Sequence, residues 1–194
     1  MKDEYQKQFE MEYMDLSKYL QKKYGKPTSP YFLAENYKTQ NKKITRVNEG
    51  LFIHHIAEYH KEYPAINNLS STNEAIKFPY EFQTPNWLCY CDYIEHVILH
   101  YKIHKLRVGK STNIPLDDGI VHYMLPELKY WYQTNGKDIA VEWKKKVWNV
   151  IKEEKQTFVE IYNMFYKEFP NEAKYSYSEF ISAEKHNKLK RKNR

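Results

Sequence analysis

The chain has 194 residues, of which 41% are hydrophobic, so it can bury the core of one compact domain and gives no reason to expect a second. No run approaches the roughly 18 apolar residues of a membrane span, and the first residues lack the apolar segment of a signal peptide. From these features we expect a soluble cytoplasmic protein and not a membrane or secreted one. The two cysteines, Cys89 and Cys91, are too close for a comfortable disulfide, which also fits a reducing compartment.

The net charge of +6 is concentrated at the C-terminus. Six bases and no acid fall in the last ten residues, 185–194: Lys185, Lys188, Lys190, Arg191, Lys192 and Arg194. The rest of the chain has 25 of the 31 basic residues against 25 acidic residues, and so carries no net charge. A basic tail is typical of proteins that contact nucleic acid, because each neutralised phosphate releases counterions. A solvated, frayed helix end explains the same charges, and both interpretations stay open.

Residues 1–49 are predicted to form an N-terminal helix and a connecting segment. Apolar side chains recur at helical spacing between Asp3 and Lys23, and Gly25 and Pro27 supply the expected stop. Residues 28–46 mix short apolar runs with polar residues, which indicates a loop or an irregular helix.

Residues 50–106 are predicted to contain two short strands and a helix. The segments 50–56 and 87–91 are apolar and rich in β-branched or aromatic residues, as strands are, whereas three prolines between residues 58 and 85 indicate a long, functional loop. Asp92 is followed three residues later by Glu95, a pattern similar to a capping box, which predicts a helix from Tyr93 to about Leu106.

Residues 107–184 are predicted to be the helical C-terminal part of the same domain. A loop at 109–119 precedes a helix at 125–132, and a long helix runs from Ile139 to Phe169, where Pro170 ends it. A last helix from Ser178 carries the basic tail. The predicted fold class is therefore mainly α, or α+β, with two short strands among flanking helices.

Four histidines carry the chemistry of this sequence. His96 and His100 lie four residues apart in a predicted helix, so their side chains share one face and can hold one metal ion. His54 and His55 lie next to each other in a predicted strand and point to opposite sides, so only one of them can join the helical pair. Three imidazoles with an open position are typical of a catalytic metal site, and the fourth histidine is a candidate general base.

The order of these elements resembles the HNH, or ββα-metal, endonucleases, in particular colicin nuclease domains and HNH proteins of phages, mobile elements and Gram-positive bacteria. The resemblance covers about residues 50–103 and includes the strings HHIAE at 54–58 and LCYCDYIEHVILH at 88–100; the block GIVHYMLPEL at 119–128 is a further candidate for a shared segment. It implies that His54, His96 and His100 bind one divalent ion (Mg²⁺, Mn²⁺, Ni²⁺ or Zn²⁺) and that His55 is the general base. The implied activity is hydrolysis of phosphodiester bonds in DNA, inside a bacterial or phage-infected cell.

Other polar residues near the motif have weaker assignments. The middle asparagine of the family, which braces the loop that carries the base, aligns with Trp87, and Asn86 is one place away. Glu58 is a candidate carboxylate for orienting a metal-binding histidine through a hydrogen bond. Glu95 is either a carboxylate of the same kind or, more simply, a helix cap. His104 lies one turn beyond His100 and is expected at the surface, as a nucleic-acid contact like Lys188, Lys190, Arg191, Lys192 and Arg194.

Three alternatives remain open at this stage. The histidines can be hydrogen-bonded core residues, or Cys89 and Cys91 can join them in a structural zinc site. The chain can also be a catalytically weak or inactive HNH-fold protein that acts by binding nucleic acid or a protein partner, for example as a phage-encoded inhibitor of a host defence system. The sequence does not indicate an oligomeric state.

Overall fold

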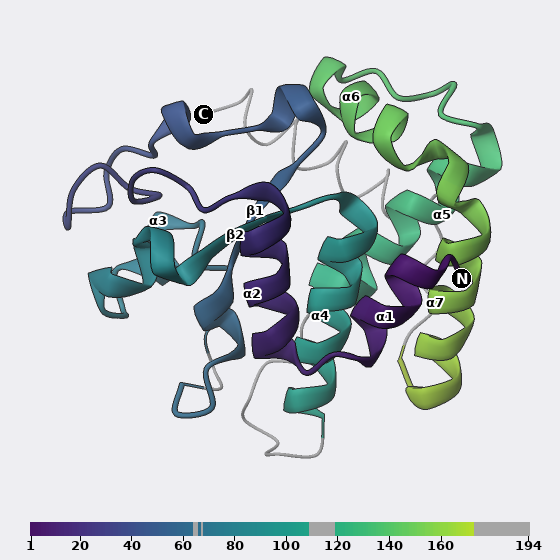
Figure 1. Cartoon of the computed structure of the whole chain (residues 1–194), viewed down its shortest axis with the longest axis horizontal. Helices are drawn as coiled ribbons and strands as arrows, with labels where there is room; N and C mark the ends of the chain where they lie inside the picture. The colour runs from purple at the N-terminus through teal and green to yellow at the C-terminus, as the bar shows by residue number, and fades with distance from the viewer. Residues whose placement is uncertain (64–65, 67, 109–118, 173–194) are drawn as a thin grey trace, which may run out of the picture.

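The computed structural model describes residues 1–63, 66, 68–108 and 119–172. This part of the chain is mainly helical, with one two-stranded antiparallel sheet beside the helices α2 and α4 (Figure 1). The expected class, mainly α with a small β component, is confirmed. None of the described helices has the length and apolar character needed to cross a membrane.

The predicted single N-terminal helix is wrong, because the chain forms two helices, α1 (Asp3–Glu10) and α2 (Tyr13–Tyr24). Met11 and Glu12 adopt extended backbone angles between them. The Lys102 ammonium donates to the carbonyl oxygens of Phe9 and Met11 at 2.8 and 2.7 Å, which satisfies carbonyls at the end of α1 that have no helical partner. Because this contact comes from a distant residue, no local signal marks the break.

The sheet pairs β1 (Phe52–His55) with β2 (Leu88–Cys91), both within the predicted strands. In this register His54 lies opposite Cys89 and His55 opposite Leu88. All four residues of β2 are buried, and α2 packs along this strand. In the predicted long loop between the strands, the described residues form short pieces of helix: α3 (Thr72–Ala75) and 3₁₀ turns at Ile56–Tyr59, Tyr80–Gln83 and Pro85–Trp87.

The helix α4 (Tyr93–Arg107) begins at the predicted capping box. An Asp92 carboxylate oxygen accepts from the Glu95 amide at 2.8 Å, and Glu95 accepts from the Asp92 amide at 2.9 Å. The helix is buried over most of its surface, and its fully buried apolar residues include Ile94, Val97, Ile98, Leu99 and Ile103. This core helix presents His96 and His100 to the sheet from a rigid support.

The C-terminal part contains α5 (Leu125–Thr134), preceded by a π-helical turn at Ile120–Met124, and then α6 (Glu142–Ile151) and α7 (Lys155–Glu168). The predicted helix from Ile139 to Phe169 is thus two helices, interrupted by a 3₁₀ turn at Lys152–Glu154. As predicted, the helical stretch, here α7, ends just before Pro170. The predicted helix from Ser178 and the basic tail lie outside the described residues.

Candidate metal centre

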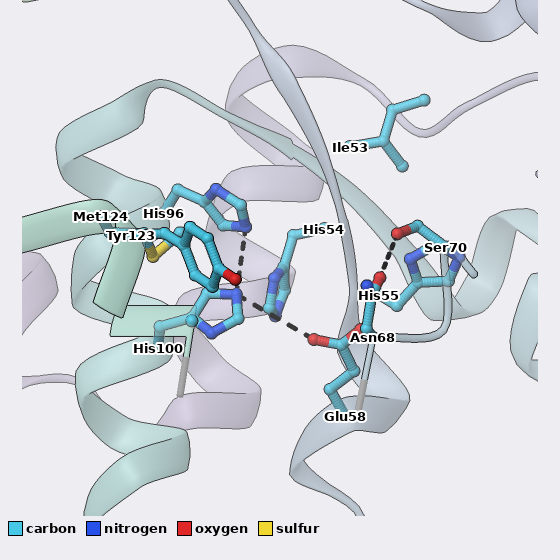
Figure 2. A pocket seen from close by; sticks show the side chains of 11 residues that line it. Ile53, His54, His55, Glu58, Asn68, Ser70, His96, His100, Tyr123 and Met124 are labelled. Carbon is cyan, nitrogen blue, oxygen red and sulfur yellow. Dashed lines mark hydrogen bonds and ion pairs between the residues drawn. The ribbon is translucent and has the colours of Figure 1, made fainter. Parts of the chain in front are cut away.

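Three of the four histidines converge on one point. The structure groups His54 of β1 with His96 and His100 of α4, with one ring nitrogen of each within 4.8 Å of the others (Figure 2). The Nε2 atoms of His96 and His100 are 3.2 Å apart. Two nitrogens that bind one tetrahedral ion at about 2.0–2.1 Å lie about 3.3 Å apart, so the observed spacing fits a shared ion.

A tyrosine of α2 fixes the tautomer of His54. The Tyr13 hydroxyl lies 2.7 Å from Nε2 of His54 and donates to the carbonyl of Ile56 at 3.1 Å. Because a hydroxyl has one proton, Tyr13 must accept from His54, whose hydrogen is therefore on Nε2. This leaves the lone pair on Nδ1 and prepares that nitrogen as a metal ligand, in the manner of outer-shell partners of metal sites.

Two histidines of the cluster, His54 and His96, are held neutral. Burial lowers the pKa of His54 and of His96 well below the ordinary value, and the neighbouring His100 lowers both further. A histidine binds a metal ion only when the ligating nitrogen carries no proton. At neutral pH these two rings therefore meet that requirement.

His55 lies on the other side of β1, where it contacts the long connection between the strands and the segment that precedes β1. Its Nε2 is 3.0 Å from the side-chain oxygen of Gln83, and its ring meets the Tyr31 ring edge-on, with centroids 4.6 Å apart. Burial lowers the pKa of His55 to about 4, although the bond to Gln83 opposes that shift. The adjacent histidines of the strand are thus separated, and only His54 belongs to the cluster.

Glu58 lies at the edge of the cluster, where the sequence predicted a carboxylate that orients a histidine. One of its carboxylate oxygens is 4.0 Å from Nε2 of His100, and the other accepts from the Leu69 amide at 2.8 Å. The Glu58 carbonyl accepts from the buried Arg107 guanidinium. These contacts hold the carboxylate beside the cluster, where its negative charge faces His100.

A cavity of about 460 Å³ opens over these groups. Its lining includes both strand histidines and the helical pair, together with side chains from the loop and from the π-helical turn: Asn68, Ser70, Tyr123 and Met124. In Figure 2 Tyr123 and Met124 lie on the side of the α4 histidines, and Asn68 and Ser70 lie on the side of His55. No sequence motif marked these four residues, although Tyr123 and Met124 fall in the 119–128 block; π-helical turns are frequent at functional sites.

Asn86 does not belong to the site. Its side chain is exposed, and its oxygen accepts from the Lys26 ammonium at 3.0 Å. Trp87 packs on Phe82 in the same connection. The amide that holds His55 is instead Gln83, which is fully buried and which sequence reasoning missed because a glutamine inside a long loop carries no distinguishing signal.

Glu95 is a helix cap tied to the N-terminal helices. Besides the Asp92 amide, its carboxylate accepts from Gln8 at 2.9 Å and from Lys23 at 2.8 Å. Of its two predicted roles, the structure shows the capping role. Burial and the neighbouring Glu95 raise the pKa of Asp92 to about 7.

The expectation that His104 lies at the surface and contacts nucleic acid is wrong. His104 is fully buried, its Nε2 is 3.0 Å from a Glu172 carboxylate oxygen, and its ring packs on those of Phe165 and Phe169. The helix α7 covers this side of α4, which the sequence of α4 alone does not reveal. The tail residues proposed for the same role, Lys188, Lys190, Arg191, Lys192 and Arg194, lie outside the described residues.

The cysteines do not form part of the cluster. Cys89 and Cys91 are buried free thiols, and burial raises the pKa of both, which disfavours the thiolate that binds zinc. Within the described ranges, the group that can hold a metal ion consists of His54, His96 and His100 alone. This composition favours a site with an open position over a closed structural zinc site.

Comparisons with known proteins give no further assignment. No protein-family model matches the chain, and no curated protein and no solved structure matches it either. The functional assignment therefore depends on the geometry of the histidines and on the resemblance of the motif.

Proposed function

We propose that this protein is a metal-dependent endonuclease of the HNH type that hydrolyses phosphodiester bonds in DNA. The observation that carries the proposal is the convergence of His54, His96 and His100 beneath an open cavity whose lining also includes His55. Two short antiparallel strands followed by the helix with the histidine pair are the arrangement expected of a ββα-metal motif.

The three clustered histidines would hold one divalent ion, Mg²⁺, Mn²⁺, Ni²⁺ or Zn²⁺, and would do so through Nδ1 of His54 and Nε2 of His96 and His100. When bound, the ion supplies positive charge that stabilises the charge developing on a phosphate. Glu58 helps to keep His100 in place.

His55 is the proposed general base. As water attacks phosphorus, the new P–O bond forms, the ester P–O bond breaks and His55 takes the proton that water loses. The leaving oxygen takes a proton from solvent, and His55 returns its own to solvent. The pKa of His55 is low in the protein alone, but a phosphodiester anion in the cavity favours the protonated ring and raises that pKa toward neutrality.

Cleavage of supercoiled plasmid tests the proposal. The protein is incubated with Mg²⁺, Mn²⁺, Ni²⁺ or Zn²⁺, beside the variants His55→Ala and His60→Ala. His60 is a matched control, because it lies in the same connection but does not line the cavity. We expect nicked or linear product from the wild type and from His60→Ala, and none above background from His55→Ala.

The outcomes separate the two functional classes. An intact plasmid with every metal, or equal cutting by His55→Ala, contradicts the nuclease. If the same protein shifts DNA in a gel without cutting it, the binding protein with an inactive HNH fold is the better description.

A further inference from the structure

Gln83 lies in the connection between the strands, and its side chain both donates to a backbone carbonyl of that connection and contacts a proposed catalytic group. It is fully buried, and its backbone carbonyl accepts from the Tyr31 amide at 2.8 Å. This backbone bond holds the residue in place whatever its side chain. Its side-chain nitrogen donates to the Leu69 carbonyl at 3.3 Å, and its side-chain oxygen lies 3.0 Å from Nε2 of His55.

These two contacts determine where the hydrogen of His55 lies. A carbonyl oxygen only accepts, so the group that faces Leu69 must be the amide nitrogen of Gln83. The amide oxygen then faces His55, and because it also only accepts, Nε2 of His55 must carry the hydrogen. In a neutral imidazole the lone pair is then on Nδ1.

We propose that Gln83 is a positioning residue that holds His55 in the tautomer with hydrogen on Nε2, so that Nδ1 is the atom that accepts the proton of water. The tautomer follows from the hydrogen bonds alone, and only its catalytic consequence rests on the proposed function. The Tyr31 ring packs edge-on to His55 and limits rotation of the imidazole, so that its Nε2 edge stays towards Gln83.

Two substitutions separate the acceptor from the rest of the side chain. Gln83→Met has nearly the same length but offers His55 no oxygen, whereas Gln83→Glu keeps an oxygen that accepts from Nε2 whether or not the carboxyl is protonated. Gln21→Met is the matched control, because the Gln21 amide also braces this region, but its hydrogen bonds go to the backbone carbonyls of Pro85, Asn86 and Leu88 and not to the His55 ring.

Nitrogen NMR of the histidine rings, with the His55 signals assigned by their loss in His55→Ala, tests the tautomer directly. We expect wild type, Gln83→Glu and Gln21→Met to show a hydrogen on Nε2 of His55 that exchanges slowly with water. In Gln83→Met that hydrogen should exchange too fast to be seen. A hydrogen on Nδ1 in the wild type, or the same protected Nε2 hydrogen in Gln83→Met, overturns the inference.

Cleavage kinetics test the consequence. We expect Gln83→Met to lower kcat by about 10- to 100-fold with unchanged metal affinity, Gln83→Glu to recover most of that loss, and Gln21→Met to cut like the wild type. Equal kcat for Gln83→Met and the wild type overturns the positioning role. If the wild type does not cut at all, the proposed function fails, while the NMR result still decides whether Gln83 fixes the tautomer.

Discussion

The two faces of β1 use the same residue type in different ways. On one face, His54 meets two histidines of a core helix and a tyrosine of α2, which together form a cluster of ring nitrogens. On the other face, His55 meets Gln83 of the connection between the strands and Tyr31 of the segment before β1, and it has no histidine partner in the described cluster. In both rings the hydrogen is directed to Nε2 by a neutral oxygen, and Nδ1 keeps the lone pair.

This difference separates two tasks. A metal ion needs several converging donors on a rigid support, and α4 provides that support through its buried apolar residues. A general base needs only one nitrogen with a free lone pair and access to water. Substitutions on the two faces of β1 are therefore expected to have different effects, which the following experiments measure.

The largest effect is expected for metal binding after loss of a helical histidine. His96→Ala or His100→Ala removes one of three donors, so affinity for Mn²⁺ or Zn²⁺ should fall by more than the roughly 10- to 100-fold typical of outer-shell partners. Titration calorimetry measures this metal affinity. If either variant binds the ion as tightly as the wild type does, these histidines are not the ligands.

Loss of the proposed base should affect cleavage and leave metal binding unchanged. General bases contribute about 10²- to 10⁴-fold to rates, so His55→Ala should slow plasmid cleavage by a factor in this range. Because His55 lies outside the cluster, calorimetry of the same variant should give the affinity of the wild type. A joint loss of affinity and rate would mean that the two faces of β1 are not separable.

Acid should destabilise the protein without metal through His55. Its pKa is about 4 in the folded state and near 6.5 in the unfolded chain, so the unfolded state binds the proton first as pH falls. This contribution to stability is present above about pH 6.5 and is lost progressively toward pH 4, by about 3 kcal/mol in total.

Urea unfolding at several pH values checks this prediction. Asp92, whose pKa is raised to about 7, acts in the opposite sense, because its contribution is complete at low pH and is lost as pH rises toward 7. The informative quantity is therefore the difference between wild type and His55→Gln. Equal pH slopes for the two proteins would rule out His55 as the source.

The smallest effect is expected for the hydroxyl behind His54. Tyr13→Phe removes the acceptor for Nε2 of His54, so metal affinity should fall by about 10-fold, with a loss of about 1 kcal/mol in stability. Tyr132→Phe is the control, since it removes a buried hydroxyl that donates to the Ile151 carbonyl far from the cluster. Equal metal affinity for both variants would show that the Tyr13 hydroxyl does not strengthen metal binding by His54.

The sequence predicted what depends on local patterns. The spacing of His96 and His100, the capping box at Asp92 and the two strands all follow from contacts within a few residues, and the structure contains each of them. Strand alternation also predicted that only one of the adjacent histidines joins the helical pair, although it did not choose between them.

Features that depend on distant contacts were not predictable in this way. The break between α1 and α2 depends on Lys102, and the burial of His104 depends on α7. The amide that contacts His55 belongs to Gln83, whereas the motif suggested Asn86. Each involves residues separated by more than 25 positions in the sequence, where no local periodicity carries information.

The most direct test is anomalous diffraction from crystals of the protein grown with Mn²⁺ or Zn²⁺. We expect one peak between Nδ1 of His54 and Nε2 of His96 and His100, with an open coordination position that faces the cavity. A peak bound by Cys89 and Cys91, or none at the histidines, would contradict the metal centre and with it the proposed nuclease.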